Sequence, residues 1–302
     1  MAIPIIFVHK SNSDYLKYTL SQAKYFNPES PIILIGDDTN DKYKFVKHYN
    51  INDYFESAND FASIYKHLSF NEYNYELFCF QRWFIIKDFI IKNNIDDFLY
   101  LDSDVLLFCN INKEFVKYKS YDFTICKELS PPYTYFSSKD KLINFCEYIK
   151  SLYTDEKMHE RLLKKFKKHQ DEKLSGGVCD MTAFYEYNKD FSENVFDLNK
   201  EIDGSIFDNN FNFSEGFEID KKFNVKKIYW KRRIPYGKRK VDNKLIKFNG
   251  LHCQGGSKNF TYIFYRGDFY FFNYLKVKLR NFYYEAKEKI KIKTVIKNIL
   301  GR

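Results

Sequence analysis

The sequence contains no long apolar run, no C-x-x-C pair and no internal repeat. Its apolar segments fall short of the ~18–20 residues that a membrane-spanning helix needs, so we expect no such helix. The first apolar run, residues 3–8, is too short for a secretory signal and follows no basic residue. Most of the six cysteines lie in apolar surroundings, which predicts buried free thiols in a reducing compartment. These absences favour the cytoplasm, or the cytosolic face of the cell membrane, as the site of action.

Net charge is also small over most of the chain. Residues 273–302 contain seven Lys and two Arg against two Glu, so they carry +7 of the formal net charge of +9. Apolar and basic residues alternate there at helical spacing, which is typical of an amphipathic helix on an anionic membrane surface. A C-terminal helix packed on the body is the alternative. We expect no nucleic-acid partner, because no recognition module is evident.

Apolar side chains make up 44% of the whole sequence, which is enough to form a sizeable core. Apolar runs at 3–8, 32–35, 98–101 and 123–126 predict buried strands, and residues 14–26 and 79–92 predict helices. The strand–helix–strand order at the N-terminus predicts a parallel pair. The polar stretch 147–173 is expected to be helical, as a lid or an exposed insertion. We therefore predict an α/β domain over residues 1–272, with a mixed, mostly parallel sheet flanked by helices, and an amphipathic helical tail over 273–302.

Polar residues follow three of the predicted strands, at 9–14, 37–38 and 102–104. In open α/β sheets, ligands bind at the carboxyl ends of the strands. His9 and Asp37 are therefore candidate ligand contacts, together with the 102–104 segment.

The segment Asp102-Ser103-Asp104 places two carboxylates two residues apart directly after a buried strand, with the apolar residues 105–107 behind them. Two carboxylates between buried strands are costly without a cation. A hard divalent cation prefers oxygen ligands and often completes its shell with substrate phosphate. A solvated loop between two strands is the alternative. The pair predicts a site for Mn²⁺ or Mg²⁺ that binds a diphosphate.

A second element, residues 251–258, places His252, Gly255 and Lys258 at intervals of three. An imidazole can complete the ligand shell of a metal, particularly manganese. Glycine allows close approach of the backbone to phosphate, and lysine supplies a compact positive charge for a leaving group. A buried histidine followed by a glycine-rich turn is the alternative.

The D-x-D motif, the H-x-x-G-x-x-K pattern and the 150 residues between Asp102 and His252 resemble GT-A glycosyltransferases, in particular glycosyltransferase family 8 and related bacterial lipopolysaccharide and capsule sugar transferases. The resemblance covers roughly residues 3–260. It implies a GT-A, Rossmann-like fold. The roles that it implies are as follows: Asp102, Asp104 and His252 hold the metal, Ser103 lies beside the nucleotide-sugar, Gly255 and Lys258 contact its diphosphate, and Arg82 reaches the donor from the helix before the D-x-D strand.

The middle of the chain matches the family loosely. Gly176 and Gly177 fit a small-residue segment that lines the donor sugar in the family. Family members also carry a polar residue near the reacting sugar carbon, and Asp180 competes for this role with Asp208 and Asn209. This departure from the family pattern leaves the stereochemistry open, although the H-x-x-G-x-x-K match favours retention.

The expected activity is metal-dependent transfer of a hexose from a nucleotide-sugar, UDP-linked, to a glycan or lipid-linked acceptor in surface polysaccharide or lipopolysaccharide synthesis. A non-catalytic sugar- or lipid-binding protein on a transferase fold and an inverting transferase are the alternatives. A nucleotidyltransferase is disfavoured, because residues 9–13 contain no glycine for a phosphate loop.

Overall fold

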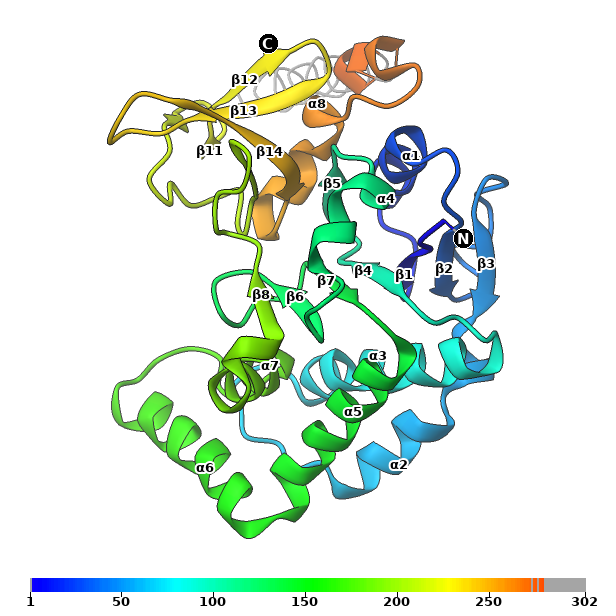
Figure 1. Ribbon diagram of the computed structural model, residues 1–302, viewed down its shortest axis with the longest axis vertical. Helices are drawn as coiled ribbons and strands as arrows, with labels where there is room; N and C mark the ends of the chain where they lie inside the picture. Colours follow the sequence, from blue (N-terminus) through cyan, green and yellow to red (C-terminus); the bar gives the residue numbers. More distant parts are fainter. Residues whose placement is uncertain (1, 273, 276, 280–302) are drawn as a thin grey trace, which may run out of the picture.

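The computed structural model describes residues 2–272, 274–275 and 277–279. Its centre is a seven-stranded sheet in the order β3-β2-β1-β4-β7-β6-β8, in which four of the six strand pairs are parallel (Figure 1). The predicted mixed, mostly parallel sheet is thus confirmed. Its strands are β1 (Ile5–His9), β2 (Ile32–Gly36), β3 (Lys47–Asn50), β4 (Phe98–Leu101), β6 (Phe123–Ile125), β7 (Tyr133–Phe136) and β8 (Val195–Asp197).

Helices cover both faces of this sheet because successive strand residues point to opposite sides. In β1, Ile6 and Val8 pack into a cluster with α2, α3, α5 and α7, whereas Ile5 and Phe7 pack into a second cluster with α1 and α4. The helices are α1 (Leu16–Phe26), α2 (Glu56–Ile64), α3 (Tyr73–Lys92), α4 (Ile111–Glu114), α5 (Lys139–Thr154), α6 (Glu156–Asp171), α7 (Asp180–Asp190) and α8 (Thr261–Phe264), with short 3₁₀ segments at Ile51–Tyr54, Phe115–Tyr118, Ser192–Asn194 and Gly255–Phe260.

A second sheet lies beyond the end of the first and is joined to it through β5, which follows β4 along the chain (Figure 1). In this sheet β14 pairs antiparallel with β5, so that His252 faces Val105 across the ladder. Residues 147 positions apart in the sequence therefore become neighbours. The remaining strands are β5 (Val105–Leu107), β9 (Ser205–Phe207), β12 (Ile228–Lys231), β13 (Ile234–Lys238) and β14 (Leu245–His252), and a separate hairpin is formed by β10 (Ile219–Asp220) and β11 (Val225–Lys226).

Two sequence-based helix predictions require correction. The helix expected at residues 79–92 begins earlier, at Tyr73, because the Glu72 side chain caps it by accepting from the backbone N–H groups of Asn74 and Tyr75. The polar stretch 147–173 is not one exposed helix. Its first part belongs to α5, which contributes buried side chains to the core, and a break at Asp155 separates it from the largely exposed α6.

The six cysteines are free, as predicted, and four of them are buried. Among the described residues, no helix is both long and apolar enough to cross a membrane. The predicted amphipathic tail at 273–302 lies almost entirely outside the described residues.

Candidate functional site

Asp102 and Asp104 lie in the tight connection between β4 and β5. Leu101 ends the first strand, Val105 begins the second, and the Val105 N–H donates to the Asp102 carbonyl at 3.0 Å. Because buried strands fix both ends of this turn, the carboxylates have little freedom to separate. Asp104 is buried, with 6% of its surface exposed, and Asp102 is half-buried.

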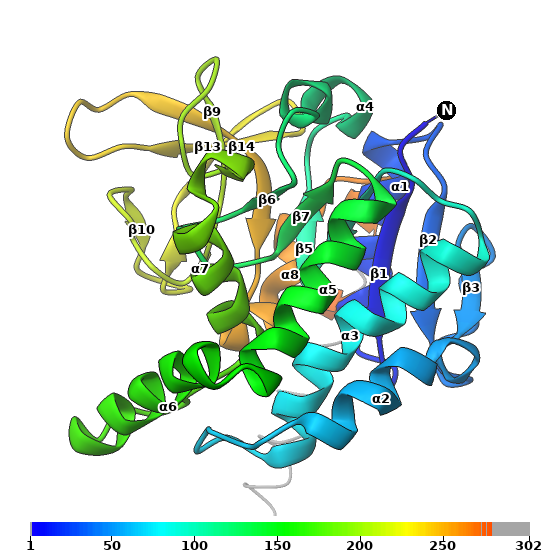
Figure 2. The ribbon, with the colours of Figure 1, turned by 60° about the horizontal axis from the view of Figure 1, so that its bottom comes forward.

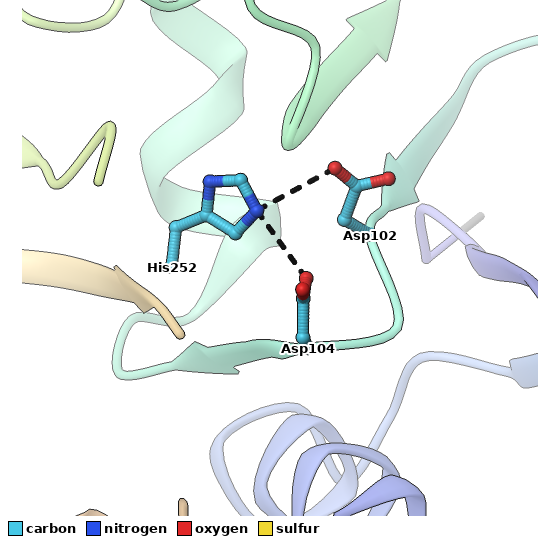
Figure 3. Close-up of side chains that lie close together, drawn as sticks. All are labelled: Asp102, Asp104 and His252. Atoms are coloured by element: carbon cyan, nitrogen blue, oxygen red, sulfur yellow. Dashed lines mark ion pairs between the residues drawn. The ribbon is translucent and has the colours of Figure 1, made fainter. Parts of the chain in front are cut away.

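His252 ends β14 and points at both carboxylates (Figure 3). Its Nε2 lies 3.6 Å from Asp102 Oδ2 and 3.3 Å from Asp104 Oδ1. One ligand atom from each of these three residues lies within 4.8 Å of the others. The structure therefore brings together the three residues that the sequence predicted as metal ligands.

The second oxygen of each carboxylate is already engaged by a neighbour. Asp102 Oδ1 accepts from the Tyr100 hydroxyl at 2.6 Å and from Arg82 at 2.9 Å, and Asp104 Oδ2 pairs with the Lys258 ammonium at 3.1 Å. One oxygen of each aspartate consequently remains directed toward the His252 ring. This division suits the chemistry of a divalent-cation site, in which outer partners orient the ligand atoms.

The tautomer of His252 is set by a contact on the side of the ring away from the carboxylates. Its Nδ1 lies 2.7 Å from the Asn209 carbonyl, which can only accept, so Nδ1 carries a proton and Nε2 faces the carboxylates. Burial alone would lower the pKa of His252. The adjacent Asp104 and Asp102 carboxylates together outweigh burial and raise the pKa to about 9. The raised pKa reflects the negative charge of the two carboxylates, which a divalent cation at the same place would balance. The three donor atoms and their oxygen-rich character fit Mn²⁺ or Mg²⁺.

A buried ion cluster around Lys226 fixes residues 208–210, which lie behind His252. The Lys226 ammonium, 1% exposed, lies 2.6 Å from Asp208 Oδ1, from Glu215 Oε2 and from the Asn210 carbonyl. The other Asp208 oxygen accepts from the His252 backbone N–H at 3.1 Å. Asp208 and Asn209 therefore lie behind the histidine and do not line the cleft, so a role for either at the reacting sugar carbon is not supported by this geometry.

Arg82 connects the aspartate pair to α7. Its guanidinium spans Asp102 and the first residue of α7, Asp180, whose Oδ2 also accepts from the Trp83 indole N–H at 3.0 Å. Asp180 is buried to 2% exposure yet lines the cleft. Of the three candidates for a polar group near the reacting carbon, Asp180 is the one that faces the cleft.

The H-x-x-G-x-x-K element turns directly into the cleft after β14. Gly255 adopts a φ of +49°, and the short 3₁₀ segment Gly255–Phe260 carries Lys258 back toward Asp104. Gly255 and Lys258 both line the cleft. Lys258 is half-exposed there, so its ammonium can reach a bound anion as well as Asp104.

Gly176 and Gly177 also line the cleft, but the close approach at Gly177 is to another part of the chain. Its φ is +153°, and a Cβ there would lie 2.5 Å from the Leu68 carbonyl oxygen. The neighbouring Ser69 forms a β-bridge with Gly177. Gly177 is thus required by backbone packing that positions the entrance to α7.

The two remaining candidates lie at the ends of β1 and β2. His9 lines the cleft, and its Nε2 lies 3.2 Å from the Ser13 hydroxyl. Asp37 is outside the cleft lining and accepts from the Ser11 backbone N–H at 2.6 Å, which orders the loop after β1. Ser103 lines the cleft between the two aspartates.

These residues surround a cleft of about 1040 Å³, large enough for a nucleotide-sugar together with part of an acceptor. Sequence reasoning missed several members of its lining, because their local patterns are those of ordinary surface residues. They include Lys10, Tyr15, Tyr75, Lys165, Lys168, His169, Met181 and Tyr185.

No family model matches the sequence, and no curated protein matches it. Similar solved structures include mouse xyloside xylosyltransferase 1 in its apo form, with a TM-score of 0.48 and 9% identity over 66% of this chain and 85% of that one. The galactosyltransferase LgtC, in complex with donor and acceptor sugar analogues, gives a TM-score of 0.44 and 11% identity over 84% and 87% of the two chains. The glycosyltransferase GlyE of Streptococcus pneumoniae gives 0.34 and 13% over 66% of this chain and 45% of that one. All three of these structures are glycosyltransferases, and all three TM-scores lie below 0.5. The function of the chain is therefore argued from its own side chains.

Proposed function

We propose that this chain is a metal-dependent glycosyltransferase that moves a hexose from a nucleotide-sugar, UDP-linked, to a glycan or lipid-linked acceptor. The observation that carries the proposal is the convergence of Asp102, Asp104 and His252 within 4.8 Å, at the edge of a cleft that also contains Lys258 and Arg82. Mn²⁺ or Mg²⁺ would be held by these three residues. When bound, such a cation stabilises the negative charge that develops on a departing diphosphate.

Two cationic side chains of the cleft have different roles in this proposal. Lys258 lies on the cleft side of Asp104 and supplies a second positive charge to the leaving diphosphate, assisted by the open backbone at Gly255. Arg82 orients Asp102 through one guanidinium nitrogen and Asp180 through another. It therefore keeps the aspartate at the metal and the aspartate at α7 in fixed relation.

Asp180 is our choice for the polar group near the reacting sugar carbon. Three donors, from Arg82, Trp83 and the Met181 backbone, hold its carboxylate. A carboxylate bound so completely is poorly suited to remove a proton from an acceptor, because its lone pairs are occupied and a cation lies against it. An inverting reaction needs such a general base, so this arrangement favours a retaining reaction, with Asp180 as a fixed negative group beside the sugar.

The acceptor is proposed to be met at a membrane surface. Exposed Phe269, Phe271 and Phe272 directly precede the basic tail. Together with the charge of residues 273–302 they support a peripheral association with an anionic membrane at its cytoplasmic face, where a lipid-linked acceptor would be available. Surface polysaccharide or lipopolysaccharide synthesis is the corresponding process.

The experiment is a screen of nucleotide-sugars for release of free nucleoside diphosphate with Mn²⁺, with Mg²⁺ and with excess chelator. We expect turnover of at least one donor that requires the metal and is lost in Asp104→Asn, a substitution that keeps side-chain volume. The exposed Asp60 on α2 provides the matched control Asp60→Asn, which should behave as wild type. Chelator-resistant turnover, or full activity of Asp104→Asn, contradicts metal dependence. Tight binding of a nucleotide-sugar without any turnover would instead indicate the non-catalytic alternative.

A further inference from the structure

The end of the cleft beyond Asp180 is bordered by α6, which packs on the core through Leu162, with Met158 and Phe166 beside it, and is otherwise largely exposed. Leu162 is its only fully buried residue, and Figure 2 shows the helix extending away from the other helices, beside α7. Three of its side chains nevertheless line the cleft, namely Lys165, Lys168 and His169. They occupy positions i, i+3 and i+4, so they share one face of the helix.

Lys165 lacks the anionic partner that Arg82 and Lys258 have in the same cleft. Arg82 is paired with two aspartates and Lys258 with Asp104. Lys165 is half-buried and donates to the Thr182 hydroxyl at 2.7 Å, but it makes no ion pair with any described residue. Burial lowers its pKa, with partial compensation from Cys179 and Glu186. A partly buried ammonium next to a neutral hydroxyl is stabilised when an external anion completes its surroundings.

The neighbouring carboxylates Glu76 and Glu186 offset only part of this positive charge. Glu186 lines the same part of the cleft, but Arg161 pairs with it at 3.3 Å. Lys168 has only a 4.0 Å contact with Glu172, in an exposed pair that stabilises little. The Nδ1 of His169 lies 3.0 Å from the Ser175 carbonyl, which leaves Nε2 available as a further donor or acceptor.

Apolar and aromatic surface accompanies these cations. Met181 and Tyr185 lie one turn apart on α7, are 37% and 41% exposed, and line the cleft together with Tyr75 from α3, which is 62% exposed. Tyrosine offers a flat apolar face with a polar tip, a combination that suits the face of a sugar ring. Exposed side chains of this kind around a cleft indicate a binding surface.

A chain of contacts links this surface to the metal site. Arg82 connects Asp102 to Asp180, and Thr182, in the first turn of the same helix, connects to Lys165. We propose that this end of the cleft is the acceptor subsite and that it selects a sugar carrying an anionic group, a carboxylate or a phosphate, with Lys165 as the principal contact and Lys168 and His169 beside it. This inference rests on the proposed glycosyl transfer, since it names the acceptor class of the same cleft.

The test compares methyl glucoside, methyl glucuronide and glucose 6-phosphate as acceptors and as ligands. With the donor found in the nucleotide-sugar screen, we expect kcat/KM for at least one charged acceptor to exceed that for methyl glucoside about tenfold or more. The preferred acceptor distinguishes carboxylate from phosphate recognition. Lys165→Met should abolish the preference mainly through KM, and Lys165→Arg should restore part of it. The exposed Lys164 on the same helix supplies the control Lys164→Met, which should retain the preference.

Direct binding of the three sugars, followed by NMR, separates this inference from the proposed function. If no donor is turned over but a charged sugar binds wild type and not Lys165→Met, the anion subsite stands while glycosyl transfer does not. If donor turnover is present but wild type shows no preference for a charged acceptor, or if Lys165→Met keeps that preference, the subsite is overturned and the proposed function is unaffected. Failure of both charged sugars to bind and to accept also overturns it.

Discussion

Replacement of Lys226 by methionine tests how the fold holds the metal site. The ammonium is buried and lies 2.6 Å from each of three oxygens, which belong to Asp208, Glu215 and Asn210. Methionine fills most of the same volume, so the main loss is of charge. Glu215 keeps Lys127 at 2.6 Å, but Asp208 is fully buried and has no other cation partner among the described residues.

Breaking a buried ion pair by removing one partner typically costs about 3–5 kcal/mol, because the other charge remains uncompensated. A loss of this size is a large part of the roughly 5–15 kcal/mol by which a typical domain is stable. Urea unfolding, followed through the fluorescence of the two tryptophans, measures it as a lower midpoint at unchanged slope. The site should suffer too, since Asp208 and Asn209 hold the backbone and the ring of His252. We therefore expect Mn²⁺ affinity to fall about 10–100-fold, as for other outer-shell substitutions.

Two further variants make this prediction decisive. Lys226→Met combined with Asp208→Asn removes both charges and should recover part of the lost stability, because no uncompensated carboxylate remains. Lys221→Met, at an exposed position of the same hairpin, should change stability by less than about 0.5 kcal/mol. The reasoning is refuted if Lys226→Met costs under about 1 kcal/mol, or if the double variant is no more stable than the single one.

Four other outcomes follow from the site and its surroundings. Lys258→Ala should raise the barrier by about 2.7–4 kcal/mol and lower kcat more than it raises donor KM, whereas an unchanged kcat in steady-state assays would identify a merely solvated lysine. Proton NMR of the product should show the donor's anomeric configuration retained, and an inverted product would reject our assignment of Asp180. His252, with a pKa of about 9, must lose its proton to bind a metal. Apparent Mn²⁺ affinity measured by calorimetry should therefore rise about tenfold per pH unit from pH 7 to 9 and then level off, and an affinity that does not change with pH would contradict this. Gly177→Ala should cost about 1–3 kcal/mol in thermal unfolding through strain at its positive φ and collision with Leu68, while Gly256→Ala, where a Cβ would meet nothing, should be nearly neutral.

Local sequence patterns predicted the first half of the sheet well. The strands β1, β2 and β4 and the helix α1 were found within a few residues. Each strand is a short apolar run, the helix has clear helical spacing, and polar residues or prolines separate them. The aspartate pair was found for the same reason, because it directly follows a buried strand. Helix α5 was misread, since its apolar stripe is interrupted by lysines and glutamates that point to solvent.

Residues that depend on pairing between distant segments could not be derived in this way. The approach of His252 to Asp104 results from the β5–β14 ladder, and only the family resemblance suggested it beforehand. Asp208 was a candidate because family members carry a polar residue near the reacting carbon, and its actual partner, Lys226, looks like any surface lysine in the sequence. Lys165 was missed for the same reason, as its approach to the cleft depends on how α6 packs beside α7.

The central claim is that Asp102, Asp104 and His252 hold one divalent cation that in turn binds a nucleoside diphosphate. Electron paramagnetic resonance of Mn²⁺, titrated into the protein with and without UDP, measures both parts together. The account predicts one bound Mn²⁺ per chain, tighter binding when UDP is present, and at least tenfold weaker binding in folded Asp104→Asn and His252→Ala variants. Equal Mn²⁺ binding by wild type and both variants, or binding that UDP leaves unchanged, would contradict it.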